Sequence, residues 1–126
     1  MRRLHMAQTR ELWTSNLVDA ARAIAGAEHQ QRRWLDPGRF AWERPEELIN
    51  TIWDDCLLEL YIEEYGNALP RAQAEAVTAL RDELNHYCDA TPKNLDPVQV
   101  LADPRWEVVR SKARSFVAAF ESNVSE

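Results

Sequence analysis

The stretch that decides the fold is PEELINTIWDDCLLELYIEEYG, which runs from Pro45 to Gly66. Its apolar residues recur every three or four positions, which is the period of one face of an α-helix. Pro45 suits the first position of a helix, the two glutamates behind it suit the positive end of the helix dipole, and Gly66 is a typical stop. The pattern therefore predicts one continuous helix over residues 45–65. Its expected core stripe consists of Ile49, Ile52, Trp53, Cys56, Leu57 and Leu60.

The opposite face of this predicted helix is acidic, but it also carries two large aliphatic side chains, Leu58 and Ile62. The segment from 45 to 66 contains seven Asp or Glu residues and no Lys or Arg. Exposed apolar residues rimmed by charge are typical of protein interfaces, whereas a merely solvated face does not need them. Glu63 and Glu64 also break a helix rule, because the dipole disfavours acids in a last turn. We therefore expect a partner-binding surface made of Asp54, Asp55, Leu58, Glu59, Ile62 and Glu63.

The rest of the chain shows the same helical period, and no run alternates as a β-strand does. The further predicted helices start at Thr9 or Ser15, at Pro70, at Pro97 and at Pro104. The first of them ends near Trp34, where LDPGR supplies turn chemistry. We therefore predict an all-α fold, a single-domain bundle of four main helices plus one short helix. The domain is expected to cover 1–126, with residues 1–8 disordered and residues 121–126 forming a frayed tail.

Core stripes can be assigned to the other long helices from the same spacing. They are Leu12, Trp13, Val18, Ala21, Ile24 and Ala25 on the first helix, Val77, Leu80, Leu84, Tyr87 and Cys88 on the third, and Trp106, Val109, Ala113, Phe116, Val117 and Phe120 on the last. Both cysteines, Cys56 and Cys88, fall inside these patterns, so we expect two buried, reduced thiols.

Composition limits the class of protein. A chain of 126 residues with 45% apolar residues and five Trp can bury one real core. The N-terminal residues do not form a signal peptide, and no apolar stretch approaches the ~20 residues that span a bilayer. We therefore expect a soluble, cytoplasmic protein without a membrane segment, and the chain carries no signature of a particular oligomeric state.

The net charge of −6 is unevenly distributed. Residues 45–103 contain three Lys or Arg and thirteen Asp or Glu, a net charge of −10, while both flanking segments are weakly positive. Such a field disfavours nucleic acid and accelerates the approach of basic partners. The charge alone therefore predicts either a surface that meets a basic protein or a solvated acidic face that keeps the protein soluble.

Two other classes of function stay open. Asp55, Glu59 and Glu63 are spaced four residues apart, and Glu83-x-x-His86 is one of the two motifs that a di-iron bundle needs, which suggests a carboxylate-ligated metalloenzyme. The basic runs QQRRW at 30–34 and RSKAR at 110–114 suggest an antitoxin-like DNA-binding regulator. Motifs for nucleophilic or phosphate chemistry are absent from the sequence. The main expectation is a non-enzymatic protein with no catalytic residues, no metal and no cofactor.

Two segments carry a resemblance, FAWERPEELINTIWDDCLLELYI and LADPRWEVVRSKARSFV, with the short motifs Trp53-Asp54-Asp55 and Asp103-Pro104-Arg105-Trp106. In these the chain resembles small bacterial helical proteins of unknown function and is similar to immunity proteins of contact-dependent growth inhibition. The resemblance implies a cytoplasmic inhibitor that binds the toxic C-terminal domain of a bacterial effector protein and blocks it. It implies no catalytic residue, because binding alone performs that role.

Overall fold

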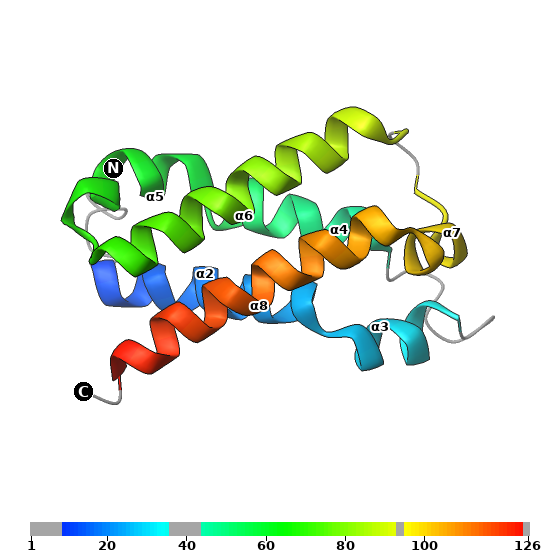
Figure 1. Cartoon of the computed structure of the whole chain (residues 1–126), viewed down its shortest axis with the longest axis horizontal. Coiled ribbons are helices and arrows are strands. Elements are labelled where there is room, and N and C mark those ends of the chain that lie inside the picture. The colour runs from blue at the N-terminus through cyan, green and yellow to red at the C-terminus, as the bar shows by residue number, and fades with distance from the viewer. Residues whose placement is uncertain (1–8, 36–43, 93–94, 125–126) are drawn as a thin grey trace.

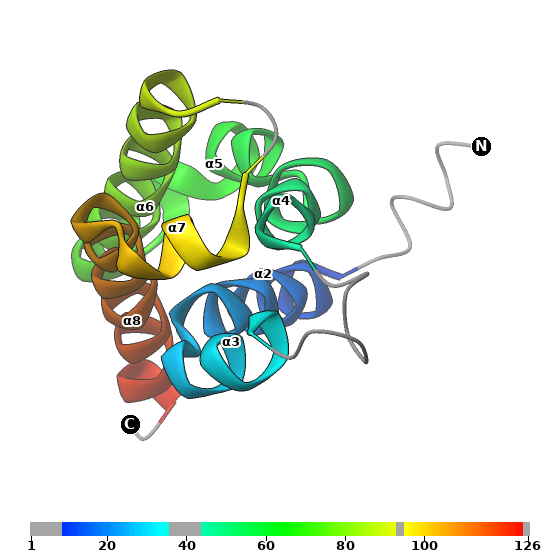
Figure 2. The same ribbon diagram turned by 90° about the vertical axis from the view of Figure 1, so that its right-hand side faces the viewer.

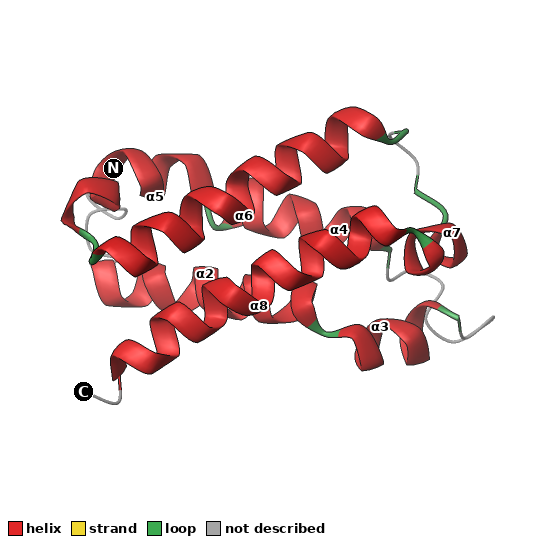
Figure 3. Cartoon of the chain, in the orientation of Figure 1, coloured by secondary structure: helices red, strands yellow, loops and turns green. Residues whose placement is uncertain are grey.

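The computed structural model describes residues 9–35, 44–92 and 95–124. These residues form helices joined by short connections, with no strand among them (Figure 3), and this confirms the predicted all-α fold. Residues 1–8, 125 and 126, for which disorder or fraying is predicted, lie outside the described part. The elements are α2 (Arg10–Ala25), α3 (Ala27–Trp34), α4 (Pro45–Asn50), the π-helical turn η1 (Thr51–Asp55), α5 (Leu58–Tyr65), the 3-10 turn η2 (Gly66–Ala68), α6 (Arg71–Ala90), α7 (Pro97–Ala102) and α8 (Pro104–Val124).

The long helix α8 packs along both α2 and α6 and runs antiparallel to each of them (Figure 1). Viewed along the bundle, α4 and α5 complete the ring of helices, and α7 lies across the near end (Figure 2). The fully buried Trp106 anchors this end of the core. The rings of Tyr87 and Trp34 lie 5.3 and 6.1 Å from its ring, centroid to centroid.

The predicted first helix is not continuous, because it breaks at Gly26 into α2 and α3. Gly26 has φ −77° and ψ 78°, which is not helical. The break leaves carbonyl oxygens at the end of α2 without helical partners. The buried Gln30 satisfies two of them, since its Nε2 donates to Ala23 O at 3.0 Å and to Ile24 O at 2.8 Å.

The later helices begin where their prolines predict. Pro70 precedes α6, and α7 and α8 begin at Pro97 and Pro104. The helix α8 continues to Val124, and the expected fraying of residues 121–126 stays a prediction.

Most of the predicted core stripes are buried, but four members are exposed: Leu12, Leu57, Leu60 and Cys88. Leu57 and Leu60 belong to the interrupted helix described below. Leu12 and Cys88 each lie one position beside the inward-facing stripe of their helix, which runs through Trp13 on α2 and through Tyr87 on α6. The expectation of a buried thiol is therefore wrong for Cys88, and it is confirmed for Cys56.

Candidate interaction surface

The predicted helix over residues 45–65 is interrupted in its middle. After α4 the backbone widens into the π-helical turn η1, and Cys56 N–H donates to Thr51 O, five residues back, at 2.9 Å. Leu57 then adopts the left-handed conformation, with φ 53° and ψ 55°. A new helix, α5, starts at Leu58, and its first backbone hydrogen bond runs from Tyr61 N to Leu57 O at 3.0 Å.

Leu57 is the only non-glycine residue with positive φ in the described part of the chain. A left-handed conformation brings Cβ close to the following carbonyl oxygen and costs an L-residue about 1–2 kcal/mol. Backbone strain of this kind persists only where the surrounding structure enforces it, and it clusters at functional sites, as π-helical turns do. The break is therefore a candidate functional feature.

The interruption changes which leucines face solvent. Leu58 and Tyr61 are 0% exposed, whereas Leu57 and Leu60 are 37% and 40% exposed. The prediction is therefore wrong for Leu58, which belongs to the core, and Ile62 is only half-buried, packed against that core. The physical reason is that a π-turn and one left-handed residue together rotate everything after residue 57 relative to a regular helix.

The N-terminal helix α2 holds the break in place. Trp13 Nε1 donates to Cys56 O at 2.7 Å, so the indole occupies a carbonyl that the interruption freed. Cys56 Sγ donates to Asn16 O at 3.6 Å, and burial together with the neighbouring carboxylates of Asp55 and Asp19 raises the pKa of this thiol. The ring of Trp13 also stands edge-on to Tyr61, at 5.4 Å between centroids. A tertiary contact therefore fixes the new register.

The side chains that the register turns outward surround a hollow of about 490 Å³. We call it the acidic–apolar hollow. Its lining residues are Trp53, Asp54, Leu57, Glu59, Leu60 and Glu63. It thus combines an aromatic ring, two exposed leucines and three carboxylates. The surface is acidic and apolar, as the sequence predicts, but its leucines are Leu57 and Leu60 instead of the predicted Leu58.

The three carboxylates of the hollow differ in their partners. Glu59 accepts from Arg81 of α6, with Nη1 and Oε1 3.2 Å apart, and the same guanidinium contacts Asp82 at 2.7 Å. In the described part of the chain, no cation forms an ion pair with Asp54 or Glu63, and both are exposed. These two carboxylates are available to a partner.

Asp55 points to another part of the surface. It lines a second hollow, of about 460 Å³, together with Asp19, Thr51 and Cys56. The six predicted surface residues therefore separate: Asp54, Glu59 and Glu63 lie together, Asp55 lies apart, Leu58 is buried and Ile62 is half-buried. The predicted row of Asp55, Glu59 and Glu63 is not assembled in a single hollow.

A larger hollow, of about 520 Å³, lies between α2, α6 and α8. Its rim charges pair with one another, because Arg22 contacts both Asp19 and Glu121. Inside it, Tyr61 and Thr14 share a hydrogen bond of 2.7 Å between their hydroxyl oxygens. With several of its polar groups paired in this way, this hollow is a weaker candidate than the acidic–apolar hollow.

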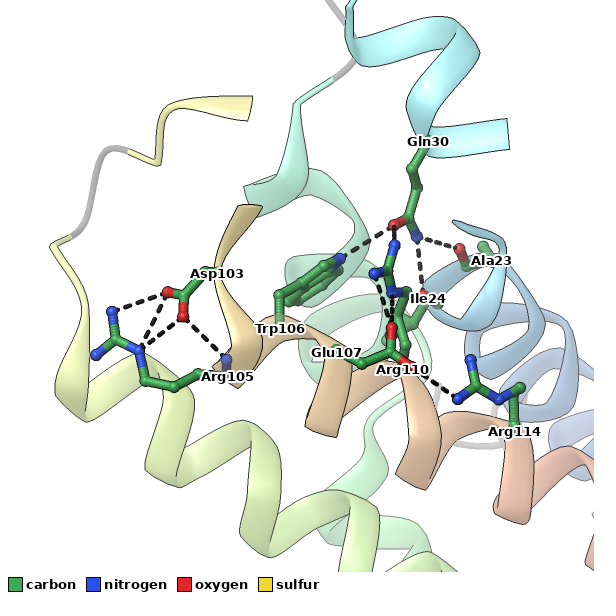
Figure 4. A network of polar contacts seen from close by, with 9 residues as sticks. All are labelled: Ala23, Ile24, Gln30, Asp103, Arg105, Trp106, Glu107, Arg110 and Arg114. Carbon is green, nitrogen blue, oxygen red and sulfur yellow. Dashed lines mark hydrogen bonds and ion pairs between the residues drawn. The ribbon is translucent and has the colours of Figure 1, made fainter. Parts of the chain in front are cut away.

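The motif that runs from Asp103 to Trp106 has a structural role (Figure 4). Asp103 Oδ1 accepts from the backbone N–H of Arg105 at 2.9 Å, and the guanidinium of Arg105 holds the pKa of this carboxyl below its usual range. Trp106 is fully buried, and its Nε1 donates to Gln30 Oε1 at 3.0 Å. This half of the resemblance therefore lies on residues that shape the core.

Parts of both basic runs are engaged within the molecule. In QQRRW, Gln30 and Trp34 are buried, and in RSKAR the nearly buried Arg110 and the exposed Arg114 both bind Glu107 (Figure 4). Gln30, which joins α2, α3 and α8, was not predicted from the sequence. A glutamine next to four polar residues gives no signal that it is buried.

The Glu83-x-x-His86 motif lies on α6 with His86 exposed. Within residues 9–35, 44–92 and 95–124, no group of three or more His, Cys, Asp or Glu side chains is arranged to hold a metal ion.

None of the helices in these segments combines the length and apolar character needed to cross a membrane. In comparisons with known proteins, no protein-family model, curated protein or solved structure matches the chain.

Proposed function

We propose that this chain is a non-enzymatic immunity protein that binds a basic bacterial toxin domain through the acidic–apolar hollow and thereby blocks the toxin. The observation that carries the proposal is the strained backbone of Leu57, which is held left-handed in the wall of this hollow. Asp54 and Glu63 line the same hollow, and neither forms an ion pair with a cation in the described part of the chain. A chain that needed only a stable core would gain by a regular helix here, so the strain favours a role in binding.

Charge supports a basic partner. The segment 45–103 carries a net charge of −10, and the hollow opens within this segment. Carboxylates at the rim steer a basic protein and raise its association rate, while desolvated leucines at the centre slow its dissociation. Immunity by binding needs only these two contributions, which agrees with the family that the sequence resembles.

The test compares protection of cells by matched leucine variants. The cognate toxin is sought first in the gene immediately upstream, as the C-terminal domain of a large secreted protein. Leu57→Ala with Leu60→Ala removes the apolar centre of the hollow, and the expected loss of affinity is about 1–3 kcal/mol for each truncated side chain. The matched control is Leu12→Ala with Val98→Ala, which truncates two other exposed aliphatic residues.

The hollow variant is expected to lose protection at an unchanged protein level, and the control is expected to keep it. Leu58→Ala reports on folding, since a fully buried leucine costs about 2–5 kcal/mol when truncated. If the hollow variant stays folded and protects as well as the control does, this surface does not bind the toxin.

A further inference from the structure

The acidic–apolar hollow has apolar walls and acidic edges. Leu57 and Leu60 supply aliphatic surface, and the half-buried Trp53 supplies an aromatic ring. Asp54 and Glu63 contribute carboxylates that no described cation neutralises. A well-matched occupant is therefore apolar on its faces and carries positive N–H donors on its edges.

Among protein side chains, arginine has this distribution of polarity. The guanidinium is planar and weakly hydrated, so its faces stack on aromatic and aliphatic groups while its five N–H donors reach carboxylates from the edge. Its methylene stem covers apolar surface. A lysine ammonium is a compact, strongly hydrated point charge. It has no flat apolar face, so it cannot stack on the ring of Trp53 while it binds the carboxylates.

One such contact already exists at the rim of the hollow. Arg81 of α6 reaches Glu59 from the side, at 3.2 Å between Nη1 and Oε1. This internal pair engages the third carboxylate and leaves Asp54 and Glu63 for an incoming cation. Arg81 therefore decides which carboxylates of the hollow a partner meets.

We propose that the acidic–apolar hollow is an arginine-binding site, which accepts an arginine side chain of the partner protein. The stem lies on Leu57 and Leu60, the guanidinium stacks on Trp53, and its N–H groups donate to Asp54 and Glu63. The identity of the partner rests on the proposed function, but the preference for arginine is a property of this chain alone and is measured without the toxin.

The experiment titrates the full chain with a hexa-arginine peptide and with a hexa-lysine peptide of equal charge, at one salt concentration. The readout is the indole N–H resonance of Trp53 in the NMR spectrum, assigned from its loss in Trp53→Phe. The arginine peptide is expected to bind about two- to fivefold more tightly, the ratio that corresponds to a stacking contact on an exposed ring.

Three variants separate the site from general acidity. Asp54→Asn with Glu63→Gln is expected to weaken binding of the arginine peptide more than Glu47→Gln with Glu64→Gln, which removes the same charge from exposed positions outside the hollow. Arg81→Gln frees Glu59 and is expected to tighten binding.

Equal affinities for the two peptides would overturn the inference, as would an unperturbed Trp53 resonance or equal losses in the two charge-matched pairs. Failure of the proposed function looks different: the arginine preference and its dependence on Asp54 and Glu63 persist, while the Leu57 and Leu60 double variant still protects cells.

Discussion

The left-handed conformation of Leu57 counteracts an ordinary rule of helix energetics, and this effect is measurable. In a helix interior, glycine is less stable than alanine by about 1 kcal/mol, because glycine loses more backbone freedom on folding. At a left-handed position the alanine carries a Cβ clash of about 1–2 kcal/mol that glycine avoids. At position 57 the clash offsets or outweighs the entropy, so Leu57→Gly is expected to be more stable than Leu57→Ala by up to about 1 kcal/mol.

Leu60 provides the matched control. It lies inside α5, and its exposed fraction of 40% is close to the 37% of Leu57, so truncation removes similar contacts at both positions. At Leu60 the usual order is expected, with Leu60→Gly less stable than Leu60→Ala by about 1 kcal/mol. The glycine-to-alanine difference in stability should therefore be higher at position 57 than at position 60, by about 1–2 kcal/mol, the size of the clash.

The four variants are compared by urea unfolding followed by far-ultraviolet circular dichroism. The m-value of a small protein in urea is about 1–3 kcal/mol/M, so the gap corresponds to about 0.3–2 M. This is the difference between the glycine-to-alanine shift in urea midpoint at position 57 and the same shift at position 60. If glycine is less stable than alanine at both positions by similar amounts, the helix runs regularly through residue 57. The exposed leucines and the acidic–apolar hollow would then be wrongly placed.

Two further predictions concern the core. Gln30→Leu is expected to lower the free energy of unfolding, measured in urea, by about 2–4 kcal/mol. It removes the acceptor of the buried Trp106 indole and the donor to two backbone carbonyls. The control Gln31→Leu, at an exposed position, is expected to change this free energy by less than about 0.5 kcal/mol. Burial raises the pKa of Tyr87 from 10.0 to about 12, so its contribution to stability is complete below pH 10 and is lost as the pH rises towards 12. Tyr87→Phe should therefore flatten the alkaline fall in urea midpoint between pH 10 and pH 12, and an unchanged slope would contradict this.

The acidic and apolar character of the candidate surface follows from the sequence, but its leucines do not. A regular helix over residues 45–65 places Leu58 and Ile62 outside and Leu57 and Leu60 inside, and the structure has the reverse exposure for Leu57, Leu58 and Leu60. Helical periodicity assumes a constant rotation per residue, so one π-turn and one left-handed residue invalidate every assignment after them. Carboxylates stay exposed in either register, because burial of an unpaired charge is prohibitive.

The sequence by itself determined the all-α class, the starts of α6, α7 and α8, and the inward stripe of α8, since proline positions and apolar spacing act locally. Only the tertiary structure decided where the two remaining predicted helices break. At Gly26 the freed carbonyls are satisfied by Gln30, and at Leu57 the freed Cys56 carbonyl is satisfied by Trp13, 43 positions away in the chain. A buried break of this kind is stable when a side-chain donor replaces the lost helical hydrogen bond, whether that donor is nearby, as Gln30 is, or distant, as Trp13 is. The spacing of apolar residues carries no information about such polar donors.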